Sequence, residues 1–133
     1  MKNTKIRLFG LLKLSVVLLG LFSGCGNEAG TAYGQITAEE ARRLMENESV
    51  VFVVDARTDS EFAEGHIPGA ILIPEYEVAE KAEEKIPDRD ALILVYCRSG
   101  RRSKIAAEEL VKLGYTNVKE FGGIVGWPYE TVK

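Results

Sequence analysis

Cys97 follows an apolar segment and opens a short run that is rich in arginine. The run reads Cys97-Arg98-Ser99-Gly100-Arg101-Arg102. A thiol becomes a strong nucleophile as its thiolate, and neighbouring cations or inward-pointing backbone amides favour that anion. The same positive charges attract anionic substrates. The pattern therefore predicts nucleophilic chemistry of the Cys97 thiol on an anionic substrate.

The elements on either side of Cys97 are those that would position it. Residues 91–96 are apolar, apart from the Tyr96 hydroxyl, and predict a buried strand. A helix is expected from Ser103 to Leu113, with Gly114 ending it at the C′ position. Because open α/β sheets bind ligands beyond the carboxyl ends of their strands, Cys97 occupies a favoured place. Gly100 permits the left-handed backbone that a curled loop requires.

The rest of the chain alternates between strand and helix patterns. Thr37 and Glu40 form a capping-box pattern before a helix that should end near Asn47. Further strands are expected at 50–54, 71–73 and 118–121, a charged helix at 75–85, and a tight turn at 122–123. This alternation predicts a parallel α/β sheet.

The Cys97 loop resembles the active-site loop of single-domain rhodaneses. Supporting motifs occur in the same order as in that family: Asp55-Ala56-Arg57, Glu61-Phe62, Gly65-His66-Ile67-Pro68-Gly69-Ala70, Gly122-Gly123 and Trp127. The resemblance covers residues 35 to 128, nearly the whole expected domain, and several motifs in order are more specific than any one of them. It implies an α/β fold, an open parallel sheet of about five strands with helices on both faces.

The resemblance also implies a sulfurtransferase. Such an enzyme moves a sulfane sulfur from thiosulfate or a persulfide, through a cysteine persulfide, to a thiol or cyanide, and needs no metal or organic cofactor. The implied site residues are Cys97 as the catalytic nucleophile, Arg98, Ser99, Gly100, Arg101, Arg102 and Ser103 as the active-site loop, and Asp55 and Arg57 in support. The loop amides would hold the persulfide, and Arg98 and Arg102 would orient the anionic donor.

Other functions fit parts of the same pattern. Cysteine phosphatases usually place an arginine six residues after the cysteine, where this chain has Ser103, so by analogy the loop length favours sulfur transfer over a phosphatase or an arsenate reductase. A sulfur carrier or protein-binding module without turnover remains an alternative, with a protein as acceptor or partner. A thiol redox or peroxide sensor is a third alternative; it predicts reversible oxidation of Cys97 and lacks a resolving cysteine in this chain. His66 is expected to be structural, and Asp55 and Arg57 could form an ion pair that holds a strand end.

The first residues resemble the signal of a bacterial lipoprotein. A basic flank and an apolar run lead to Leu21-Phe22-Ser23-Gly24-Cys25, which resembles a lipobox except that Phe22 stands where leucine is usual. We expect residues 1–24 to be an export signal, Cys25 to carry lipid, 25–34 to be a tether and 35–133 to be the domain. The alternatives are a plain secreted protein and an uncleaved helix.

Charge and location limit the partners. The signal holds four of the 17 basic residues and none of the 20 acidic ones, so the remainder has a formal charge of −7. An acidic domain argues against nucleic acid as a partner. The expected partners are a small anionic sulfur donor, a thiol acceptor, and a membrane of the bacterial envelope reached through Cys25, with the domain outside the cytoplasm.

Overall fold

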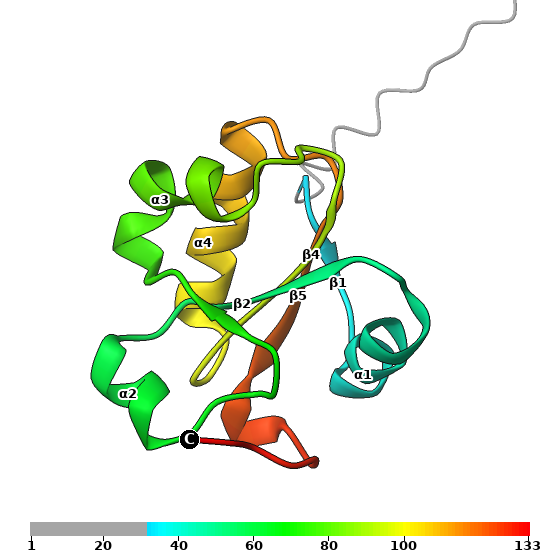
Figure 1. The fold of residues 1–133 in the computed structure, drawn as a ribbon, viewed down its shortest axis with the longest axis vertical. Coiled ribbons are helices and arrows are strands. Elements are labelled where there is room, and N and C mark those ends of the chain that lie inside the picture. Colours follow the sequence, from blue (N-terminus) through cyan, green and yellow to red (C-terminus); the bar gives the residue numbers. More distant parts are fainter. Residues whose placement is uncertain (1–31) are drawn as a thin grey trace, which may run out of the picture.

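Five parallel strands form one sheet in the computed structural model, which describes residues 32–133 (Figure 1). In spatial order they are β1 (Gly34–Gln35), β5 (Val118–Gly123), β4 (Leu92–Cys97), β2 (Val51–Asp55) and β3 (Ile71–Leu72). The helices are α1 (Ala38–Asn47), α2 (Asp59–Glu64), α3 (Val78–Lys85) and α4 (Arg101–Lys112), with 3₁₀ turns η1 (Glu75–Glu77) and η2 (Ile124–Gly126). The predicted fold class is confirmed.

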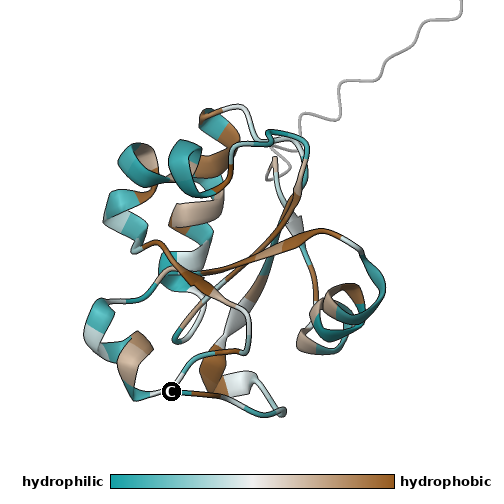
Figure 2. Ribbon diagram, in the orientation of Figure 1, coloured by the Kyte–Doolittle hydropathy of each residue, from teal (hydrophilic) through white to brown (hydrophobic). Residues whose placement is uncertain are grey.

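Alternating side chains of the central strand divide the core into two layers. In β4, Ile93, Val95 and Cys97 belong to the cluster packed against α3 and α4. Leu92, Leu94 and Tyr96 belong to the opposite cluster, which α1 covers. Figure 1 shows α1 across the sheet from α3 and α4, and Figure 2 shows apolar strands between helices with hydrophilic outer faces. All six residues of β4 are buried, because a parallel strand between two helix layers has no solvent face.

Local sequence signals set several element ends. The expected capping box at α1 is present, with the Thr37 side chain accepting from the Glu40 N–H at 3.1 Å. Thr58 and Glu61 repeat this capping arrangement at α2, a helix that the sequence reading did not include. Gly114, with a φ of 94°, follows the end of α4 as predicted.

Some expected boundaries were wrong. α4 begins at Arg101 rather than Ser103, because Gly100 takes a left-handed φ of 108° and caps it. Gly122 and Gly123 continue β5 instead of forming a turn after it. The expected charged helix at 75–85 is confirmed as the 3₁₀ helix η1 followed directly by α3. The sheet begins at Gly34, one residue before the expected start of the domain, where a two-residue strand is too short to show a pattern.

The expected export signal and Cys25 lie outside the described residues. Within residues 32–133, no helix has the length and apolar character needed to span a bilayer.

Candidate active site

Cys97 ends β4 on the face of the sheet that α4 covers. Its side chain is buried, with 1% of the residue exposed, although Arg98, Ser99 and Arg101 around it are exposed. The backbone N–H of Gly100 donates to the Cys97 Sγ at 3.0 Å. The left-handed Gly100 turns this amide inward at the start of α4, so the sulfur lies at the N-terminal end of a twelve-residue helix. Backbone amides and a helix N-terminus both stabilise an anion at that position.

The balance of burial and hydrogen bonding lowers the pKa of the Cys97 thiol. Burial by itself raises it, because a buried thiolate loses its hydration. Hydrogen bonds that the sulfur makes with the Ser103 side chain and with the backbone amides of Ser103, Gly100 and Ser99 outweigh that effect. The loop therefore favours the thiolate through the hydrogen bonds that it makes with the sulfur.

Ser103 connects the sulfur to a buried acid that the sequence reading missed. Its hydroxyl lies 3.4 Å from the Cys97 Sγ and 2.7 Å from the Oε1 of Glu120, to which it donates. The N–H of Gly122 donates to the same Oε1 at 2.7 Å. Glu120 is 3% exposed, in the middle of β5. The available signal was that Glu120 alternates with Lys119 in the strand expected at 118–121, on the same face as Val118.

The three arginines of the loop differ in their surroundings. Arg98 and Arg101 are exposed. Arg102 instead donates from Nη1 and Nη2 to both carboxylate oxygens of Glu61, at 2.7 and 2.8 Å. Glu61 also caps α2, so this bidentate pair ties α4 to α2. Donor orientation by Arg98 and Arg102 stays a prediction, and in this structure the Arg102 guanidinium is bound to Glu61.

The Arg102 pair predicts a pH-dependent contribution to stability. Hydrogen bonds from Arg102 first, and from Thr58 in addition, lower the pKa of Glu61 from 4.5 to about 2. A carboxyl with a depressed folded-state pKa contributes stability above its unfolded pKa and loses it as the pH falls toward the folded value. We expect Arg102→Gln to cost about 1–2 kcal/mol of unfolding free energy at neutral pH, after allowance for solvent screening.

Urea unfolding from pH 6 down to pH 2 tests this pH dependence. The difference between wild type and Arg102→Gln should shrink between pH 4.5 and 2. Arg101→Gln, which removes an exposed arginine one residue earlier, is the matched control and should show no such trend. A constant difference across this range would contradict the Glu61 assignment.

Gly123 allows the outer side of the loop to lie directly against β5. A Cβ at Gly123 would come within 2.0 Å of the carbonyl oxygen of Arg98, so only glycine fits. The same carbonyl accepts from the Val125 N–H at 3.2 Å. A groove borders this contact, lined partly by Arg98, Ser99 and Val125. The Gly122-Gly123 pair thus supports the Cys97 loop from its own strand.

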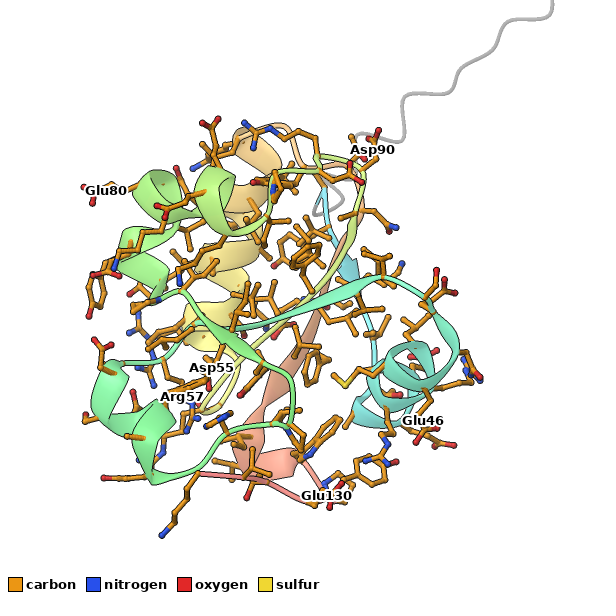
Figure 3. All side chains as sticks on the ribbon, viewed as in Figure 1. Glu46, Asp55, Arg57, Glu80, Asp90 and Glu130 are labelled. Atoms are coloured by element: carbon orange, nitrogen blue, oxygen red, sulfur yellow. The ribbon has the colours of Figure 1, made fainter. Side chains whose placement is uncertain are left out.

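Asp55 and Arg57 form an ion pair on the other side of the sheet. The Asp55 carboxylate, which is 0% exposed, accepts from the Arg57 Nη2 at 2.7 Å and from the Tyr96 hydroxyl at 2.6 Å. Arg57 Nη2 also donates to the Gly65 carbonyl at 2.7 Å. Burial first, and then this bond to Asp55, raise the pKa of Tyr96. Figure 3 shows Asp55 and Arg57 side by side near α2.

This ion pair supports the loop connections rather than the sulfur. Tyr96 packs in the cluster opposite Cys97 and accepts a hydrogen bond from the Ile67 N–H at 3.1 Å. His66 stacks on Phe62 with ring centroids 3.7 Å apart, and its Nδ1 is 3.0 Å from the Phe62 carbonyl. These contacts hold the 65–70 turn. Within residues 32–133, no cluster of His, Cys, Asp and Glu could hold a metal ion.

Comparison with known proteins assigns the family. A sequence profile described as the rhodanese-like domain matches residues 37–129. The chain is 39% identical over 71 residues to the thiosulfate sulfurtransferase PspE of Escherichia coli, covering 53% of this chain and 68% of that protein. It is 40% identical over 88 residues to a sulfurtransferase of Allochromatium vinosum, covering 65% of this chain and 79% of the other.

Solved structures have the same arrangement of strands and helices. A rhodanese with anions from E. coli superimposes with a TM-score of 0.59 at 36% identity and covers 62% of this chain and 98% of its own. A rhodanese-related protein from Thermoplasma volcanium gives a TM-score of 0.62 at 38% identity, and the match covers 75% of this chain and 98% of that protein. Fold similarity alone does not assign an activity, but here the sequence similarity extends across the Cys97 loop. The chain therefore belongs to the rhodanese-like domain family and has sulfurtransferases among its relatives.

Proposed function

We propose that this protein transfers sulfane sulfur through a persulfide on Cys97. The observation that carries the proposal is the environment of the Cys97 thiol. The thiol is buried, its Sγ accepts a hydrogen bond from the Gly100 N–H at 3.0 Å, and the hydrogen bonds around it lower its pKa. Similarity to named sulfurtransferases supports the same reaction class. Such a site stabilises negative charge on the cysteine sulfur before the reaction and on its persulfide afterwards.

The reaction has two displacement steps. In the first, the Cys97 thiolate attacks the outer sulfur of thiosulfate or of a persulfide, forming an Sγ–S bond as the donor S–S bond breaks. Sulfite or a thiolate leaves with the electron pair, and Cys97 becomes an anionic persulfide. In the second, cyanide or another thiolate attacks the terminal sulfur, and Cys97 leaves as its thiolate. Protons and electrons balance without an external oxidant or reductant.

Intact mass measurement tests the proposal on the purified full-length chain. Thiosulfate should add one sulfur, about 32 Da, to the peptide that contains Cys97, and cyanide should then remove it. No adduct with thiosulfate or with a persulfide donor would overturn the proposal. A persulfide that forms but passes to no acceptor would instead favour the sulfur-carrier or binding-module alternative, and reversible oxidation without sulfur loading would favour the redox sensor.

We also propose that Cys25 anchors the domain to a membrane of the bacterial envelope. The support is the sequence 21–25, with its basic and apolar lead. Cys25→Ala should move the protein from the membrane fraction to the soluble fraction, because the lipid attaches to this thiol. Fractionation of cells, with Cys97→Ala as the control that keeps Cys25, measures the effect. Continued membrane association of Cys25→Ala would indicate an uncleaved helix instead.

A further inference from the structure

Glu120 is a buried acid close to Cys97 that the two displacement steps do not use. Its Oε1 accepts both the Ser103 hydroxyl and the Gly122 N–H, each at 2.7 Å, and hydrogen bonds donated to a carboxyl group favour its charged form. Within residues 32–133, no lysine, arginine or histidine lies within ion-pair distance of Glu120. Its negative charge is therefore held by two neutral donors and is not cancelled locally.

The hydroxyl of Ser103 links this charge to the reacting sulfur. The hydroxyl carries one proton, and its shortest contact, 2.7 Å, is to Glu120, compared with 3.0 Å to the Gly100 carbonyl. The Cys97 Sγ lies 3.4 Å from the same oxygen. The carboxylate is thus two hydrogen bonds from the sulfur, on the protein side of the loop. Because all three residues are buried, solvent screens this charge weakly.

The charge available to a donor anion is consequently smaller than three arginines would give. The guanidinium of Arg102 is neutralised by the bidentate contact with Glu61. Arg98 and Arg101 are exposed and solvated, so each attracts an anion only weakly. The Glu120 carboxylate repels negative charge from within the site. A second negative charge on the donor therefore gains little attraction from Arg98 and Arg101, and the Glu120 carboxylate repels it near the sulfur.

We propose that Glu120 is a specificity-determining residue that biases the Cys97 loop toward singly charged sulfane-sulfur donors and against doubly charged thiosulfate. The inference rests on the proposed sulfur transfer at Cys97 and specifies its donor class. Glu120 acts through Ser103 and through its field, so it is a positioning residue. The preferred donors are anions with one charge, such as persulfides or thiosulfonates, in which the group that leaves carries one negative charge fewer than sulfite.

Two donors that differ mainly by one charge test the proposal on the full-length chain. Thiosulfate has two charges and methanethiosulfonate has one, and both present an outer sulfur on a sulfonyl group. Glu120→Gln keeps the acceptor oxygen and removes the charge. It should raise kcat/KM for thiosulfate relative to methanethiosulfonate by about tenfold, because one buried like-charge repulsion is removed. Any change in thiolate content affects both donors equally and cancels in this ratio.

The control and the contrary outcomes are distinct. Glu109→Gln, the same substitution on the outer part of α4, should leave the ratio unchanged. An unchanged ratio in folded Glu120→Gln overturns the specificity role and leaves sulfur transfer standing. If neither donor loads Cys97 in the wild type, the proposed function fails instead.

Competition by inert anions provides a measurement that needs no variant. Sulfate and methanesulfonate have two and one charges and lack a transferable sulfur. In the wild type, sulfate should slow the loading of Cys97 no more strongly than methanesulfonate does at equal concentration and ionic strength. Inhibition by sulfate at a tenfold lower concentration would contradict the proposal, whether or not Glu120→Gln folds.

Discussion

Cys97→Ser should abolish sulfur transfer while leaving the fold in place. Serine offers no sulfur for a persulfide, and the hydroxyl does not ionise at neutral pH as a thiol does. We expect no sulfur adduct after thiosulfate, and a loss of turnover of at least roughly a thousandfold, the scale on which removal of a nucleophile acts. Intact mass and thiocyanate formation from thiosulfate and cyanide measure the two effects.

The chain contains a matched control for this prediction. Cys25 is its other cysteine, so Cys25→Ser should still load one sulfur and release it to cyanide. Cys97→Ser should unfold near the temperature of the wild type, because the substitution changes one atom in a site that already contains hydrogen-bond donors. Retained turnover in folded Cys97→Ser would contradict the assignment of the nucleophile.

Among the substitutions predicted for this protein, Asp55→Asn should cause the largest loss of unfolding free energy, because it leaves the buried Arg57 cation without a counter-charge. The Asp55 carboxylate is the partner of the Arg57 guanidinium and of the Tyr96 hydroxyl, and all three residues are buried. Asparagine would leave the Arg57 cation without a counter-charge and would direct N–H groups toward the guanidinium. Breaking a buried ion pair from one side costs about 3–5 kcal/mol. Urea unfolding at neutral pH measures this loss.

A double variant separates the cost of the unpaired Arg57 cation from the cost of the hydrogen bonds that Asp55 makes. The double variant Asp55→Asn/Arg57→Met removes the cation as well. Its free energy of unfolding should therefore fall less than that of Asp55→Asn alone. If the double variant is as unstable as the sum of the two single variants, the ion pair is not the reason for the loss. Arg57 also donates a hydrogen bond to the Gly65 carbonyl. We therefore expect Asp55→Asn to slow sulfur loading of Cys97 only if the 65–70 turn loses its ordered conformation.

Much of the fold was readable because its signals are local. The buried run 91–96, the capping box at Thr37 and the helix end at Gly114 each depend on residues a few positions apart. The predicted boundaries of elements were wrong where contacts between residues far apart in the sequence determine them. β1 exists because Gly34 and Gln35 pair with Lys119 and Glu120, far along the chain. Gly123 remains extended in β5 because it packs against the Arg98 carbonyl.

The sequence by itself identified the family and predicted Cys97 and its arginine-rich loop as the site, since both rest on the order of residues along one segment and on motifs in series. Only the tertiary structure decided which charges act at the sulfur. Glu61 lies 41 positions from Arg102 in the chain, and Glu120 lies 17 from Ser103. The sheet and α4 bring both acids to the loop, where one neutralises an arginine and the other adds a buried negative charge. Charge pairing depends on distance in space and on burial, and neither is written in the local pattern of residues.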